Sequence, residues 1–102
     1  MNEMQRLMFQ AQKMQRELAK AKEGLAEKVF SVTKGGGLTL SMQGDYSNIK
    51  VAIADDLLEK DNKEMLEQLI AMAITEVIEQ IAKEDEANNE RITGNASGFG
   101  MR

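Results

Sequence analysis

The spacing of apolar residues changes twice along this chain, and that change most constrains its fold. Over residues 1–26 apolar side chains recur alternately every three and four residues, which is typical of one face of a helix. Between residues 28 and 54 apolar and polar residues alternate singly, as in strands with one buried face. Helical spacing returns over residues 62–88. The pattern predicts an α+β fold in the order α-β-β-β-α.

The first predicted helix carries an unbroken heptad seam. An isolated helix of this length is only marginally stable in water, so the seam needs a partner helix. The sequence leaves open whether the first helices of two chains pair with each other or with the last helices. We expect the seam, and with it a dimer contact, at Met4, Leu7, Ala11, Met14, Leu18, Ala21 and Leu25.

Turn residues separate the three alternating segments. Gly35-Gly36-Gly37 follows the first and residues 44–48 follow the second, and both linkers carry residues that tolerate positive φ. Antiparallel hairpins are the simplest topology, so we expect a three-stranded antiparallel sheet.

The last predicted helix begins after a sequence that resembles a capping box, with Asp61 as N-cap and Glu64 three residues on. Its apolar stripe is wide enough to cover a sheet face and still reach something else. We expect one domain over residues 1–91, followed by a flexible tail over residues 92–102.

The residue composition excludes several classes of catalytic and metal-binding site. The chain has no His and no Cys, so thiolate metal sites, thiol nucleophiles and the usual general base near neutral pH are excluded. Gly35-Gly36-Gly37 opens a strand rather than a helix, unlike a phosphate-binding loop, and Asp55-Asp56 lacks the spacing of a calcium loop. We therefore expect no enzyme, metal, cofactor or small-molecule substrate. Without a membrane span or a signal sequence, we expect a cytoplasmic protein.

Charge is divided unevenly along the chain. The net charge is −4, which by itself argues against a strongly basic nucleic-acid binder. Residues 54–90, however, carry three Lys and twelve Asp or Glu, a local net charge of −9, whereas residues 1–28 carry six Lys or Arg and four Glu, a local net charge of +2. The acidity therefore belongs to the last helix and the turn before it.

A basic ridge runs along the first predicted helix, opposite the seam. It consists of the heptad c and f positions Arg6, Phe9, Lys13, Arg16 and Lys20. A ridge of this kind with an aromatic inside it fits a phosphate backbone, and the nearby amides of Gln10 and Gln12 suit base edges. The alternative is a solvated outer face with Phe9 packed against a neighbour.

Several segments resemble the YbaB/EbfC family of bacterial nucleoid-associated proteins. They are Met8-Phe9-Gln10-Ala11-Gln12-Lys13-Met14-Gln15, Gly37 before Leu38 and Leu40, Gly44, Leu57-Leu58, the run DNKEMLEQL from Asp61 to Leu69, and Ala71 with Ala73. The resemblance covers residues 4 to 83. The chain departs from the family at Thr75, where Asn is frequent, and in a tail without Pro.

The resemblance implies a homodimer of α-β-β-β-α protomers whose long terminal helices project as arms and contact DNA in the nucleoid. We therefore expect DNA binding through Arg6, Gln10, Gln12, Lys13, Arg16 and Lys20. The alternative is a dimeric adaptor without direct DNA binding, which docks protein partners on acidic side chains of the last helix. Those side chains are Glu64, Glu67, Glu76, Glu79 and Glu84.

Overall fold

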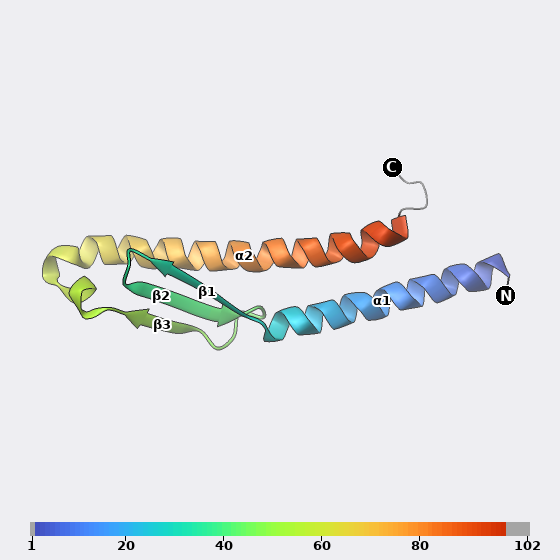
Figure 1. Cartoon of the computed structure of the whole chain (residues 1–102), viewed down its shortest axis with the longest axis horizontal. Helices are drawn as coiled ribbons and strands as arrows, with labels where there is room; N and C mark the ends of the chain where they lie inside the picture. Colours follow the sequence, from blue (N-terminus) through green and yellow to red (C-terminus); the bar gives the residue numbers. More distant parts are fainter. Residues whose placement is uncertain (1, 98–102) are drawn as a thin grey trace.

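The computed structural model of this chain describes the backbone of residues 2–97 and the side chains of residues 2–94. Its elements confirm the predicted α-β-β-β-α order and the α+β class (Figure 1). They are helix α1 (Glu3–Glu27), strands β1 (Val29–Lys34), β2 (Leu38–Gln43) and β3 (Lys50–Ile53), the short 3-10 helices η1 (Asp55–Leu58) and η2 (Lys60–Asn62), and helix α2 (Lys63–Ser97).

Helix α1 begins at a reciprocal cap that the heptad pattern did not reveal. The Asn2 side chain accepts a hydrogen bond from the Gln5 backbone N–H at 2.7 Å, and the Gln5 side chain accepts one from the Asn2 backbone N–H at 3.1 Å. These bonds satisfy two backbone donors at the helix end. The cap fixes the first turn of α1, which is the outermost part of the molecule.

The three strands form one antiparallel sheet in the order β1-β2-β3, as predicted. Phe30 lies opposite Met42, and Leu38 lies opposite Ile53. The β1–β2 turn has positive φ at Gly35 and Gly36, which glycine adopts without strain.

The β2–β3 turn is braced by side chains. The Ser47 hydroxyl and its backbone N–H both donate to Asp45, and these hydrogen bonds hold the pKa of the Asp45 carboxyl below its usual value. Tyr46 and Asn48 both adopt positive φ here, of 66° and 51°. Asn tolerates that conformation, whereas a bulky Tyr rarely adopts it.

The core lies between α2 and one face of the sheet. Its buried side chains come from alternate positions of β1 and β2 and from one stripe of α2, with Leu25 and Leu57 closing the ends. The cluster comprises Leu25, Phe30, Val32, Leu38, Leu40, Met42, Leu57, Ala73, Val77 and Ile81. The alternation therefore marks the buried face correctly in β1 and β2.

Helix α2 corrects two details of the sequence prediction. Asp61 lies inside η2, and α2 begins at Lys63, so Asp61 does not stand immediately before the helix as an N-cap. The helix also continues to Ser97 rather than ending at 88, so the tail predicted from residue 92 is wrong for residues 92–97. The reason is Ile92, which is buried at 5% exposure and gives this stretch an apolar contact. Residues 98–102 of the predicted tail lie outside the described residues.

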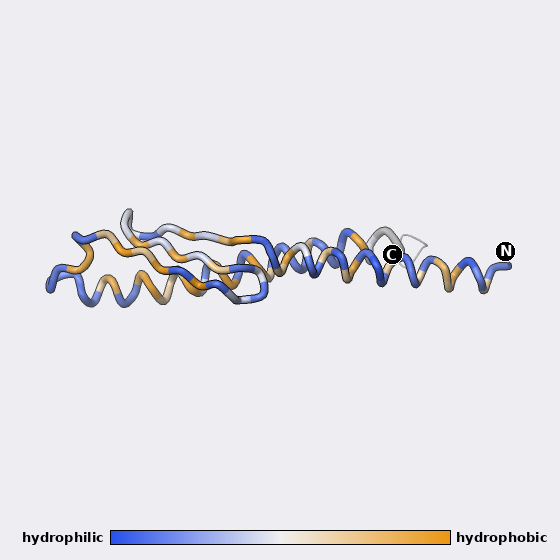
Figure 2. The backbone as a smooth tube through the Cα atoms, turned by 90° about the horizontal axis from the view of Figure 1, so that it is seen from below, coloured by the Kyte–Doolittle hydropathy of each residue, from blue (hydrophilic) through white to orange (hydrophobic). Residues whose placement is uncertain are grey.

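The molecule is an elongated rod with the sheet at one end. Figure 1 shows the C-terminal half of α2 running beside α1, away from the sheet, with α1 extending further than α2. In Figure 2 the apolar backbone positions concentrate at the sheet end, and both arm helices alternate in hydropathy. The extents are 71 × 27 × 14 Å, and the radius of gyration is 20.1 Å, against about 13 Å for a compact chain of this length.

Candidate nucleic-acid interface

We call the part of the molecule where α1 and the C-terminal half of α2 extend beyond the sheet the arm. In the arm one face of α1 is fully exposed. The C-terminal half of α2, which contains the buried Ile92, runs beside α1 (Figure 1). Along α1 the seam is half-buried at Met14, Leu18 and Ala21 and buried at Leu25. Within the chain, α2 is therefore the partner of the inner half of the seam. Residues 2–13, with Met4, Leu7 and Ala11 of the seam among them, are all exposed. A dimer contact at these outer positions stays a prediction.

The basic ridge lies on the face of α1 that points away from α2. Arg6, Lys13, Arg16 and Lys20 are all exposed and fall on heptad c and f positions, which share one face of the helix. From Arg6 to Lys20 the helix rises about 21 Å, which matches about six base pairs of a duplex. The structure thus brings the four predicted cations together on one straight surface.

These cations have no competing ion pair within the part of the chain that the structure describes. The ion pairs found there are Lys28–Glu84 at 2.6 Å, Lys34–Glu76, and Lys63–Glu67 at 3.3 Å. All of them lie at the sheet end or on α2. The ridge cations are therefore free to pair with phosphates.

The ridge changes sign toward the sheet. The next c and f positions after Lys20 are Glu23 and Glu27, both exposed. A phosphate backbone lying along the ridge would meet these carboxylates close to the sheet. The favourable surface is therefore the outer part of α1, from Arg6 to Lys20, which the heptad register alone does not single out.

Gln10 and Gln12 lie on the two flanks of the ridge, between the cations and the seam. Both are exposed on the outer part of α1. The structure thus leaves both predicted amides accessible beside the cations, one on each side.

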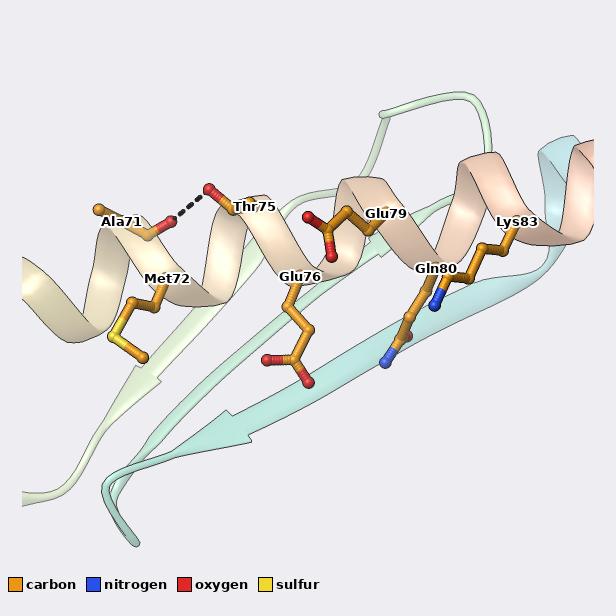
Figure 3. Close-up of a pocket in the computed structure, with 7 residues that line it drawn as sticks. All are labelled: Ala71, Met72, Thr75, Glu76, Glu79, Gln80 and Lys83. Atoms are coloured by element: carbon orange, nitrogen blue, oxygen red, sulfur yellow. Dashed lines mark hydrogen bonds between the residues drawn. The ribbon is translucent and has the colours of Figure 1, made fainter.

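The outer surface of α2 is unsuited to phosphate. Figure 3 shows a shallow hollow there, lined by Ala71, Met72, Thr75, Glu76, Glu79, Gln80 and Lys83. The Thr75 hydroxyl is bonded to the Ala71 carbonyl oxygen at 3.0 Å, so it is occupied within the helix. Glu76 is paired with Lys34 of β1, and Glu79, which has no such partner among the described residues, would repel an anion here.

The acidic side chains of α2 are also less available than the sequence suggests. Glu67, Glu76 and Glu84 each form an ion pair with a lysine of the same chain. Only Glu64 and Glu79 of the five predicted docking carboxylates have no such partner among the described residues. A basic protein partner would have to displace these lysines, which weakens the adaptor alternative.

An apolar surface beside β3 was not singled out by sequence. Val51 and Ile53 lie opposite Leu40 and Leu38, so they share the core-facing side of the sheet. Helix α2 packs against β1 and β2 and hardly touches β3, which leaves Val51 51% exposed. The signal available in the sequence was an α2 stripe wider than one sheet face requires.

Helix α2 extends this apolar surface with its own flank. Gln80 lies beside β1 together with Val29 and Phe30. At about 100° per residue, Ile74 and Ile78 are turned to the opposite side of the helix, toward β3. They are 39% and 42% exposed. We call Ile49, Val51, Ile74 and Ile78 the β3 face.

Among residues 2–97 no helix is long and apolar enough to cross a membrane. No group of His, Cys, Asp and Glu side chains in the described residues is arranged to hold a metal ion.

Comparisons with known proteins identify relatives over almost the whole chain. The profile of the YbaB/EbfC DNA-binding family matches residues 1–96. A nucleoid-associated protein of Enterococcus faecalis is 37% identical over 97% of this chain and 96% of its own length. Nucleoid-associated proteins of Agathobacter rectalis and Legionella pneumophila are 35% and 36% identical over 93% of this chain, and cover 85% and 82% of their own lengths.

Proposed function

The chain belongs to the YbaB/EbfC DNA-binding family, and from that premise we propose that it binds duplex DNA in the bacterial nucleoid through the basic ridge of α1. The named relatives are nucleoid-associated proteins, and the family is one of DNA-binding proteins rather than enzymes. We further propose that the binding unit is a homodimer whose projecting helices carry the DNA contacts.

One observation carries the proposal. Four exposed cations of α1 stand on one face, pointing away from the acidic helix, and none of them is paired within the described residues. Phosphate contacts from Lys and Arg supply most of the affinity of non-specific DNA binding. The net charge of −4 does not oppose this, because the acidic residues are concentrated elsewhere in the chain.

The affinity for DNA should fall as the salt concentration rises, and the ridge bounds how steeply. A dimer presents eight ridge cations, and each phosphate contact contributes about −0.9 to the slope of log K against log salt, so the slope is bounded at about −7. The acidic helix keeps part of the DNA away from the protein, so we expect a shallower slope. Few ridge side chains suit bidentate base contacts, so we expect weak sequence preference.

The test is an anisotropy titration of a short labelled duplex at several salt concentrations. In one variant Arg6, Lys13, Arg16 and Lys20 are all changed to Gln. We expect its affinity at low salt to fall by at least about tenfold and its salt slope to flatten. A matched control changes Lys50, Lys60, Lys63 and Lys83 to Gln, which removes the same charge from exposed positions outside α1.

Equal losses in both variants would show that total charge, not the ridge, determines binding. Unchanged binding by the folded ridge variant would place the DNA site elsewhere. Absence of binding by the unmodified protein even at low salt would refute DNA binding and favour the adaptor function instead.

A further inference from the structure

We propose that Phe9 enters the major groove and contacts thymine methyl groups, which gives the protein a preference for A·T-rich duplexes. This inference rests on the proposed DNA binding and adds a base-contacting residue to it. The Phe9 side chain takes no part in the hydrophobic core.

Phe9 is an aromatic residue without an apolar partner in its own arm. It is 55% exposed, and the hydrophobic core cluster does not include it. The seam that α2 covers lies on the opposite side of α1, so α2 does not shield the ring. Leaving a large apolar side chain exposed to water forgoes the favourable free energy of burying it. An external contact therefore accounts for Phe9 better than folding does.

The neighbours of Phe9 define what that contact is. Arg6 and Lys13 lie three residues before and four residues after it, on the same face of the helix. Both are exposed and without an ion pair in the described part of the chain. A ligand that satisfies this face must offer anionic groups next to apolar ones. Duplex DNA has this arrangement, with phosphates at the rims of each groove and bases on its floor.

The shape of the arm selects the groove. The N-terminal part of α1 extends past the described end of α2 (Figure 1), and residues 2–13 are all exposed, so here α1 stands as a single helix. An α-helix with its side chains is about 10–12 Å wide and fits the major groove, which is about 12 Å wide. Phe9 lies within the ridge between Arg6 and Lys13, so its ring would face the groove floor while these longer cationic side chains reach the phosphates.

The chemistry of the groove floor selects the base. In the major groove the base edges present hydrogen-bond donors and acceptors, and the C5 methyl of thymine is the apolar group among them. A phenyl ring cannot hydrogen-bond to the other base edges, so it leaves their polar groups unsatisfied. Contact between the Phe9 ring and thymine methyl groups is therefore favoured over contact with the other base edges.

The test compares two duplexes of the same A·T-rich sequence, one with thymine and one with deoxyuridine, which lacks the methyl group. The unmodified protein should bind the uracil duplex about fourfold more weakly, the value of one buried methyl group. Phe9→Ala should bind both duplexes equally and retain the salt slope of the unmodified protein, because no phosphate contact is lost.

The matched control is Met8→Ala. Met8 is 57% exposed and adjacent in sequence, but it lies on the seam side of α1, so this variant should still discriminate between the duplexes. Equal binding of the two duplexes by the unmodified protein would overturn the proposal. Persistent discrimination by Phe9→Ala would overturn it as well, as would a change of oligomeric state in that variant, measured by sedimentation. Failure of the unmodified protein to bind either duplex refutes the DNA-binding proposal itself.

Discussion

At the scale of single residues, Gly44 is the position with the least room. A Cβ there would lie 1.9 Å from the carbonyl oxygen of Leu25, and the Gly44 N–H donates to the Lys28 carbonyl oxygen at 2.9 Å. Because the obstacle is backbone, it cannot rotate away. We expect Gly44→Ala to lower the free energy of unfolding by about 2–4 kcal/mol, measured by urea denaturation at fixed protein concentration.

Gly24 is the control for this substitution. It lies in helix α1, and a Cβ there would meet nothing within 4 Å. Gly24→Ala should raise the free energy of unfolding by about 1 kcal/mol, because Ala has the higher helix propensity. Similar effects of the two substitutions would show that the contact between the β2–β3 turn and the end of α1 does not constrain the fold.

The turn glycines show which single-residue features can be predicted from sequence. Gly35 and Gly36 were identifiable as a turn, because they stand between two alternating segments. Gly44 was identifiable as part of a turn but not as a packing contact, since Leu25 lies far from it in sequence. The positive φ of Tyr46 had no sequence signal, because it depends on how Asp45 and Ser47 close the turn.

At the scale of elements, the arm and the sheet layer should unfold separately. Ile92 is buried where α2 runs beside α1, and Val77 is fully buried beneath the sheet. Ile92→Ala should increase amide hydrogen exchange in the outer turns of α2 and the facing part of α1, while β1 and β2 stay protected. Val77→Ala should instead lower global stability by about 1–3 kcal/mol, because it leaves a cavity in the core.

A uniform increase in exchange throughout the Ile92→Ala variant would contradict this separation. The same pair explains why sequence placed the helix end wrongly. The residues around Asn88 are polar, so composition favoured an early end. Ile92 is buried because α2 returns alongside α1, which is a tertiary contact. The seam and the ridge, by contrast, depend on spacing within one helix and were therefore predictable.

At the scale of the whole molecule, the exposed surface is larger than that of a compact monomer. The described chain exposes 7669 Å², against about 5,800 Å² for a compact monomer of 11.4 kDa. Part of the excess is the arm, which α2 only partly covers. The rest includes the β3 face, where apolar side chains from a strand and a helix are exposed together. Such a face is typical of a subunit interface, and a two-fold dimer would bury it twice.

This leads to a prediction that joins oligomeric state to DNA binding. Val51→Lys places a charge in the β3 face and should convert the proposed dimer to a monomer, measured by sedimentation. Val29→Lys is the matched control, because Val29 is 63% exposed and alternates with the core-facing Phe30 of β1; it should remain dimeric. A monomer carries half the ridge cations, so the salt slope of Val51→Lys should be about half that of the unmodified protein.

A dimeric Val51→Lys would move the interface to another surface, with the exposed outer seam at Met4 and Leu7 as the next candidate. A monomer with an unchanged slope would show that one arm makes all the phosphate contacts, and the second protomer would then have no part in holding DNA.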